Sequence, residues 1–247
     1  MSQKTYHFIV PSYIDCTRCG LCKIRRKIVF GRGVPPADIL FIGEAPGKTE
    51  DLLGLAFVGL AGRLLNQAII KAMQFAAIDI VNASEKKPAP MYLTQEDERT
   101  DMAQFIQNCN EIIKILEKVT YYITNVVACR PSDTPDGENR KPTPEESWAC
   151  FDRLNQTYIK CNPKKIVFLG DIAKKHCLKG WPEAKCLVHP AYINYHGGVS
   201  SPEFVAFARD LSDVFKELYN AEASTSTVSS PDSIRGTSRK WSINTSS

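Results

Sequence analysis

The stretch of sequence that decides the fold is Ala37–Leu65, which reads ADILFIGEAPGKTEDLLGLAFVGLAGRLL. It begins with Ile39–Ile42, a short apolar run that is typical of a buried strand. The run ends in Gly43-Glu44-Ala45-Pro46-Gly47, where glycine and proline predict a tight turn with little side-chain bulk and one carboxylate. Phe57 follows on a second glycine-flanked loop, and apolar residues then recur at helical spacing from Leu64 to Met73. In an open α/β sheet, such loops lie at the carboxyl ends of the strands, where ligands bind.

Three later segments repeat this order of apolar run, turn and helical pattern. The runs are Tyr121–Val127, Lys165–Leu169 and Cys186–Val188, and each predicts a strand. Thr143-Pro144-Glu145-Glu146 predicts a helix start with threonine as N-cap, and Ser201-Pro202-Glu203 predicts the start of a last amphipathic helix. Strands that alternate with helices predict an α/β fold. We expect a single-domain, three-layer α/β/α architecture around a central, mainly parallel, four-stranded sheet.

Polar residues lie at or just after the ends of the four predicted strands. They are Glu44, Asn125, Asp171 and His189. Because the carboxyl ends of parallel strands meet at one edge of a sheet, we expect these side chains to converge there.

The length of 247 residues fits one domain with extensions. We assign residues 1–222 to the domain, with a surface insertion at about 82–108, and residues 223–247 to a disordered tail rich in serine and threonine. Residues 82–100 are polar and predict irregular structure. Residues 101–118 have helical periodicity that turns Cys109 toward a core.

Composition limits the cellular setting. No stretch approaches the roughly 20 apolar residues that span a bilayer, and the N-terminal residues lack the apolar segment of a signal peptide. We therefore expect an intracellular protein without membrane contact. The net charge of +4 permits nucleic-acid binding without requiring it. Nine cysteines without a secretion signal favour metal ligation or free thiols over disulfides.

The motif Cys16-x2-Cys19-x2-Cys22 predicts a metal site, the alternative being inert thiols beside a basic segment. Three thiolates need a further ligand to complete a four-cysteine site, and a zinc ribbon would need a second close pair of cysteines. The other cysteines are all widely spaced, at positions 109, 129, 150, 161, 177 and 186. This scatter favours an iron–sulfur cluster built across the fold. Basic residues predict salt-dependent DNA binding, namely Arg18, Lys23, Arg25, Arg26, Lys27, Arg130, Arg140 and Lys141.

Seven motifs resemble, in order, those of the uracil-DNA glycosylase superfamily, most closely its family 4, the iron–sulfur enzymes. They are CTRC (16–19), IVFGRG (28–33), GEAPG-x2-ED-x2-G-x2-FVG-x-AG-x-LL (43–65), ITNVVACRP (123–131), RKPTPEE (140–146), IVFLG (166–170) and HPAY (189–192). The resemblance covers about residues 14–219. It implies hydrolysis of the N-glycosidic bond of uracil in DNA, which leaves an abasic site in base excision repair.

The resemblance also implies a 4Fe–4S cluster and two catalytic residues. The cluster ligands would be Cys16, Cys19, Cys129 and Cys150. Cys22 lies where the family usually has no cysteine, so it is either a bystander or a competing ligand. Glu44 would place or activate the attacking water. His189 would lie beside the negative charge that develops on the leaving base.

The remaining matching residues would bind the substrate or shape the loop. Phe57 would stack on the flipped base, and Asn125 would read the edge of uracil. An asparagine amide donates to O4 of uracil and accepts from N3–H, a pair that cytosine does not offer. Gly43 and Ala45 would line the base pocket, and Glu50 and Asp51 would organise the loop.

The chain departs from the family pattern at several places. Ala56 replaces the usual proline, no basic residue follows HPAY closely, and the segment from Gly170 to His189 is short. The altered loop after His189 leaves efficiency on double-stranded DNA open. Insertions at 82–108 and 132–139 and the serine-rich tail are further departures, which indicate a divergent or viral lineage.

The leading hypothesis is a monofunctional uracil-DNA glycosylase, because no lysine stands out as a Schiff-base nucleophile. The alternative is a DNA- or partner-binding protein of the same fold that has lost catalysis. A third reading, a zinc-stabilised nucleic-acid module, fits the thiol spacing less well. We expect a monomer that acts on uracil-containing DNA in the cytoplasm, or in the host cytoplasm if the lineage is viral.

Overall fold

The computed structural model describes residues 10–84, 95–177 and 180–226 and contains a sheet of strand order β1-β3-β2-β4-β5. The four predicted strands are confirmed and run parallel as β2 (Ile39–Gly43), β3 (Tyr121–Asn125), β4 (Lys165–Leu169) and β5 (Lys185–Leu187). The sheet has five strands rather than the expected four, because β1 (Arg32–Gly33) pairs antiparallel with β3. This two-residue strand is flanked by Gly31, at φ 149°, and by Pro35-Pro36, so no apolar alternation announces it.

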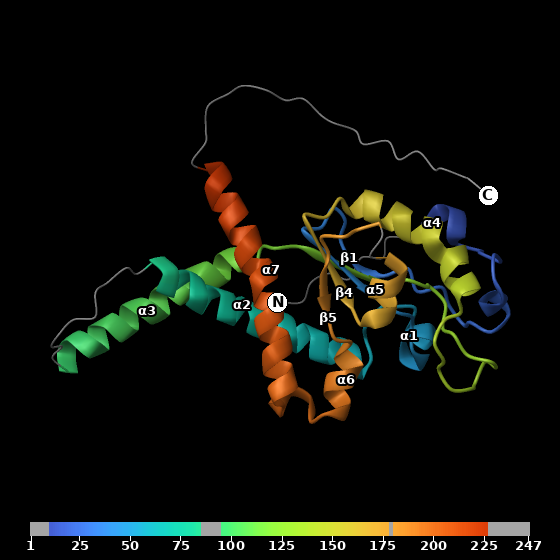
Figure 1. The fold of residues 1–247 in the computed structure, drawn as a ribbon, viewed down its shortest axis with the longest axis horizontal. Coiled ribbons are helices and arrows are strands. Elements are labelled where there is room, and N and C mark those ends of the chain that lie inside the picture. Colours follow the sequence, from blue (N-terminus) through green and yellow to red (C-terminus); the bar gives the residue numbers. More distant parts are fainter. Residues whose placement is uncertain (1–9, 85–94, 178–179, 227–247) are drawn as a thin grey trace, which may run out of the picture.

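Helices cover both faces of the sheet. One apolar cluster joins α2 (Leu60–Ser84) and α7 (Pro202–Ser226) to the face that carries Phe41. The other cluster joins α4 (Pro144–Cys161) and α5 (Asp171–Cys177) to the face that carries Leu40. Successive residues of a strand point to opposite faces, so β2 is apolar throughout because both of its faces are covered. Figure 1 shows α2 and α7 separated by the sheet from α4 and α5, which confirms the three-layer prediction.

Two helix starts follow the predicted capping chemistry. The Thr143 hydroxyl accepts from the Glu146 N–H at 3.2 Å, and the Glu146 carboxylate accepts from the Thr143 N–H at 2.8 Å. Ser201 Oγ accepts from the Phe204 N–H at 3.1 Å at the start of α7. The shorter helices are α1 (Lys48–Leu53), α6 (Pro190–Tyr195), and the 3-10 turns η1 (Pro11–Tyr13), η2 (Gly20–Lys23) and η3 (Gly198–Ser200).

The parallel strands end together at one edge of the sheet. Gly43 pairs with Asn125, and Leu169 pairs with Leu187, so the residues that follow these strands are close in space. The strand order also reverses around β2, since β3 and β4 lie on its two sides. Such a reversal is the usual position of a ligand crevice in an open α/β sheet.

The expectation of irregular structure at 82–100 is wrong for the part that the structure describes. Helix α2 continues to Ser84, and α3 (Gln95–Leu116) begins within the segment; residues 85–94 lie outside the described chain. The two helices extend together away from the sheet (Figure 1), with an apolar cluster of their own that includes Val81 and the buried Cys109. The polar composition favoured irregular structure because α3 packs only a narrow apolar face against α2, and most of its other residues are polar. Cys109 points into the apolar cluster as predicted.

Helix α7 is longer than the sequence predicts, because it runs to Ser226 and passes the expected boundary at residue 223. Residues 227–247 of the predicted tail lie outside the described chain. By length and composition α2 is apolar enough to cross a membrane, which the sequence reading did not anticipate. Half of the relevant stretch is buried, and residues from Leu64 to Val81 pack against neighbouring elements, as expected of a core helix.

Candidate functional site

A pocket of about 400 Å³ lies at the carboxyl edge of the sheet. Its lining includes Glu44, Ala45, Phe57, Asn125 and His189, so five predicted site residues share one cavity. Gly43 lies beneath them: a Cβ there would be 2.5 Å from Phe57 Cζ and 2.6 Å from Asn125 Oδ1. Only glycine therefore lets these two side chains approach the turn. Asp171 converges less closely, because it lines a neighbouring pocket that shares His189.

Glu44 follows β2 directly and is half-buried. Its backbone carbonyl accepts from the Val127 N–H at 3.2 Å, which fixes the turn against the end of β3. Its carboxylate forms no hydrogen bond or ion pair with any residue that the structure describes, so its oxygens are free to accept from water or a ligand. Burial raises the pKa of Glu44, and the positive charge of Lys141 opposes that rise.

Phe57 has a backbone φ of 53°, an uncommon conformation for a bulky residue. The ring is 6 % exposed and its centroid lies 6.1 Å from that of His189. The first turn of α2 passes so close that a Cβ on Gly62 would lie 1.7 Å from the Phe57 carbonyl oxygen. The unusual backbone at Phe57 is thus imposed by the surrounding packing, which holds the ring in the pocket wall.

The two acidic residues predicted to organise the loop do so. Glu50 Oε1 accepts from the Val58 N–H at 3.0 Å and from the Gly59 N–H at 2.7 Å, immediately after Phe57. Asp51 is 1 % exposed, and its carboxylate accepts from the Arg26 N–H at 2.9 Å. These bonds fix the aromatic loop and attach the N-terminal segment to α1.

Asn125 ends β3 and is 1 % exposed. Its Oδ1 atom is fully buried and has no hydrogen-bond partner among residues 10–84, 95–177 and 180–226. Buried polar atoms in proteins are nearly always paired, so an unpaired amide oxygen that lines a pocket calls for a donor from a ligand or water.

His189 is the N-cap of α6, and its Nδ1 accepts from the Ala191 N–H at 3.2 Å. An acceptor at Nδ1 places the proton of the neutral ring on Nε2, which leaves Nε2–H as a donor. Burial lowers the pKa of His189, and the charge of Glu50 opposes that change. Both effects of the fold, the cap and the burial, favour the neutral donor form.

The structure corrects part of the predicted basic surface. Arg130 is 2 % exposed and donates to Asn139 Oδ1 at 2.6 Å, to the Pro135 carbonyl at 2.9 Å and to the Gly137 carbonyl. It therefore braces its own loop and is too buried to contact DNA. Arg140 lines the pocket and forms a two-point ion pair with Glu146.

Sequence reasoning missed several pocket residues, and Lys48 and Asn139 are two polar ones among them. The only signal was their proximity to the matched motifs at 43–65 and 140–146.

A sequence model of the Uracil DNA glycosylase superfamily matches residues 30–212 of the chain. The chain belongs to this superfamily. Among its relatives are proteins named Type-4 uracil-DNA glycosylase. That of Archaeoglobus fulgidus is 34% identical over 67% of this chain and 59% of the relative, and that of Sulfurisphaera tokodaii is 34% identical over 68% and 56%. That of Thermotoga maritima is 31% identical over 74% of this chain and 71% of the relative.

The predicted resemblance to the uracil-DNA glycosylase superfamily and to its type 4 is thus confirmed. The chain spans a little over half the length of the first two of these relatives.

The four cysteines predicted as cluster ligands, Cys16, Cys19, Cys129 and Cys150, lie in one neighbourhood. Burial raises the pKa of Cys129 to about 12. The charge of Arg25 opposes this rise, and the charges of Cys150 and Cys19 add to it. Burial also raises the pKa of Cys19, and the charges of Cys150 and Cys16 add to that rise. Such electrostatic effects require proximity. Arg25 Nη1 donates to Cys129 Sγ at 3.7 Å, and Cys22 lies within η2.

These thiols do not surround a single point. Within the described residues, no three His, Cys, Asp or Glu side chains are placed to hold a metal ion. Four cysteine thiolates are the donor set of an iron–sulfur cluster, and the chemistry of these neighbouring thiols fits that group.

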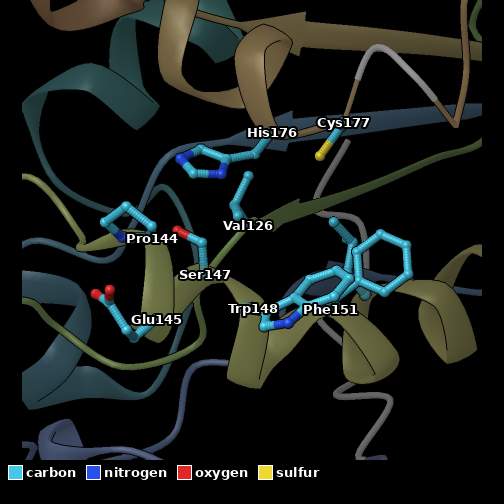
Figure 2. A pocket seen from close by; sticks show the side chains of 9 residues that line it. Val126, Pro144, Glu145, Ser147, Trp148, Phe151, His176 and Cys177 are labelled. Carbon is cyan, nitrogen blue, oxygen red and sulfur yellow. The ribbon is translucent and has the colours of Figure 1, made fainter. Parts of the chain in front are cut away.

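A second pocket, of about 390 Å³, lies beside the end of β3, between α4 and α5. Figure 2 shows Val126 between Ser147 of α4 and His176 of α5, with Trp148 and Phe151 along one side. Trp148 is 77% exposed, and its ring centroid lies 5.6 Å from that of Phe151. The end of β3 is thus lined on one side by this pocket and on the other by the predicted site.

Proposed function

We propose that this protein is a monofunctional uracil-DNA glycosylase that hydrolyses the N-glycosidic bond of uracil in DNA and leaves an abasic site. The observation that carries the proposal is one pocket that contains a neutral imidazole donor together with a buried amide oxygen and a carboxylate, neither of which has a partner in the described part of the chain. The relatives named Type-4 uracil-DNA glycosylase support the same activity.

Uracil would be read by Asn125 after the nucleotide has left the helical stack. A target base inside a duplex cannot reach an enclosed pocket, so it must be extruded. The unpaired Oδ1 of Asn125 would accept from N3–H of uracil, and its amide N–H would donate to O4. Cytosine presents an acceptor at N3 and an amino group at C4, so both contacts would be lost. An unpaired buried polar group costs about 1–3 kcal/mol, which is the basis of discrimination. Phe57 would stack on the base.

His189 would stabilise the leaving base. As the glycosidic bond breaks, its electrons move to the ring and the negative charge concentrates on a carbonyl oxygen. Nε2–H of a neutral imidazole, held by the Ala191 contact at Nδ1, would donate to that oxygen. Because the donor is oriented before the reaction, little reorganisation is needed in the transition state.

Glu44 would place the water that attacks the sugar carbon and would favour the positive charge that develops on the sugar. No residue that the structure describes forms a hydrogen bond with its carboxylate, so both oxygens are available for this role. Lys48 also lines the pocket, but it is exposed to solvent, and a Schiff-base lysine is activated by desolvation. We therefore propose hydrolysis without a lyase step.

Cys16, Cys19, Cys129 and Cys150 would hold a 4Fe–4S cluster. When bound, this group would act as a structural cross-link of thiolate bonds between distant segments. The four residues come from the N-terminal segment, the loop after β3 and α4, so ligation would join elements that are far apart in sequence.

The substrate would be uracil-containing DNA, approached by exposed cations near the N-terminal segment. Lys23 and Lys27 are exposed, whereas Arg18 pairs with Asp152 at 3.5 Å and Arg26 with Asp136 at 2.7 Å. These surface pairs are weak and can exchange for phosphates. We propose a monomer that acts in the cytoplasm, without a membrane partner.

The proposal is tested with uracil-containing oligonucleotides, single- and double-stranded, followed by alkaline cleavage at abasic sites. We expect cleavage only where uracil stood, and none with matched cytosine- or thymine-containing strands. If protein with its cluster intact leaves both uracil substrates uncleaved, the alternative of a binding protein of this fold replaces the enzyme.

A further inference from the structure

Arg153 on α4 has a wholly buried side chain, with 0% of its surface exposed. Its Nη1 donates to Thr124 Oγ1 at 2.8 Å, and its Nη2 donates to the carbonyl oxygens of Asn125 and of Val126, the latter at 2.7 Å. All of these acceptors are uncharged and lie at the end of β3. The guanidinium thus donates to three consecutive residues, Thr124, Asn125 and Val126.

A buried charge of this kind is unfavourable for folding by itself. Arginine keeps its charge in proteins. The free-energy cost of removing that charge from water is offset fully only by good hydrogen bonds and a counter-ion. Here the hydrogen-bond acceptors are neutral oxygens, and Nε has no partner among the residues that the structure describes. Methionine or leucine would fill a similar volume without that cost. The arrangement therefore points to a role in holding the end of β3.

The segment that Arg153 holds carries the residue that would read the base. On the opposite side of this segment, the Val126 N–H donates to the Gly43 carbonyl at 2.9 Å. The peptide after Asn125 is thus held from both sides, by α4 through its carbonyl and by the Gly43 turn through its N–H. Figure 2 shows Val126 enclosed by side chains of α4 and α5, next to the helix that supplies the arginine.

We propose that Arg153 is a positioning residue for base recognition, which fixes the backbone of Asn125 so that the unpaired Oδ1 stays in the pocket. The inference rests on the proposed uracil excision and extends it to a residue outside the pocket. A free backbone at this point would let the amide rotate toward other partners. Arg153 would then influence uracil excision entirely through Asn125.

A double-mutant cycle tests this statement, because coupled residues do not act additively. Arg153→Met is compared in two backgrounds, the natural chain and Asn125→Ala, with kcat/KM for a single-stranded uracil oligonucleotide as the measurement. We expect a loss of about 10- to 100-fold in the natural chain and less than about threefold in the Asn125→Ala background. Equal losses in both backgrounds would overturn the proposal and leave an ordinary structural role.

Hydrogen exchange gives a second readout that does not depend on activity. In Arg153→Met, the amides of Val126 and Val127 are expected to exchange faster, while those of α7 keep their protection. The matched control is Arg209→Met, because Arg209 is exposed and pairs with Asp79 on another part of the molecule. Unchanged exchange at the end of β3 would contradict the inference even if the natural chain proved inactive on uracil.

If Arg153→Met does not fold, Arg153→Lys carries the test. Lysine keeps the charge but lacks the planar fork that reaches several acceptors at once. We expect Arg153→Lys to fold, to exchange faster at Val126 and to keep only part of the excision rate of the natural chain. An undiminished rate with lysine would contradict the proposal, because it would show that the positive charge matters and the fixed backbone does not. If the natural chain itself excises no uracil, the proposed function is refuted instead.

Discussion

Glu44→Gln is the sharpest test of the proposed chemistry, because it changes the charge of one group and almost nothing else. Glutamine has the shape of glutamate, and the Glu44 carboxylate has no hydrogen bond to the described residues that the change could break. Burial raises the pKa of Glu44, so the folded protein disfavours the charged form, and the neutral amide removes that penalty. We therefore expect a change in unfolding free energy within about 0.5 kcal/mol.

The same substitution is expected to remove most uracil excision. General-base and electrostatic roles of a carboxylate contribute about 10²–10⁴-fold, which corresponds to roughly 3–5 kcal/mol of transition-state stabilisation. Binding of uracil-containing DNA should persist, since Asn125 and Phe57 are untouched. Single-turnover excision with alkaline cleavage measures the rate, and fluorescence anisotropy measures binding. Glu117→Gln, at an exposed position beyond α3, is the matched control.

The pH profile supplies an independent check with a defined sign. Water placement needs the carboxylate, so the rate of the natural chain should fall as the pH drops through the raised pKa of Glu44. The residual rate of Glu44→Gln should lack this acidic limb. An undiminished rate in Glu44→Gln would refute the assignment and transfer the role to Glu50, which also lines the pocket.

Three further substitutions test other parts of the site and fold. Gly43→Ala should reduce kcat/KM for excision at least about tenfold, because the added methyl group forces Phe57 and Asn125 apart. Activity equal to that of the natural chain would show that the turn has more room. Cys150→Ala should lose iron, measured by metal analysis of anaerobically purified protein, and should lower Tm; full iron content would remove it from the ligand set. Thr143→Ala should cost about 0.5–2 kcal/mol in denaturant titration with excision unchanged, since it removes only a helix cap.

Local patterns predicted the sheet and its helices because those patterns have local causes. Ile39–Ile42 is apolar on both faces since helices cover both, and Thr143 caps α4 through bonds to a residue three positions later. The residues at the carboxyl ends of β2, β3 and β5 could be assigned to one site because parallel strands share an edge.

The errors have a common physical origin in contacts between distant segments. Strand β1 exists only because β3 offers it hydrogen bonds, and α3 is polar along most of its length because it covers α2 with a narrow face. Arg130 was expected at the surface with the other cations. It is buried because its own loop supplies three oxygen acceptors, which no periodicity in the sequence reveals.

The features that position the site are those that break local rules. Phe57 has a positive φ and is held by hydrogen bonds from the following residues to Glu50, and Asn125 keeps a buried oxygen without a partner. Arg153 carries a buried charge toward the same strand end, on the helix that also carries Cys150 one turn earlier. Each feature is unfavourable when considered alone, and proteins retain such exceptions mainly where function requires them. All three lie around the end of β3, and a preorganised base pocket, as we propose for this site, accounts for their combined cost in folding free energy.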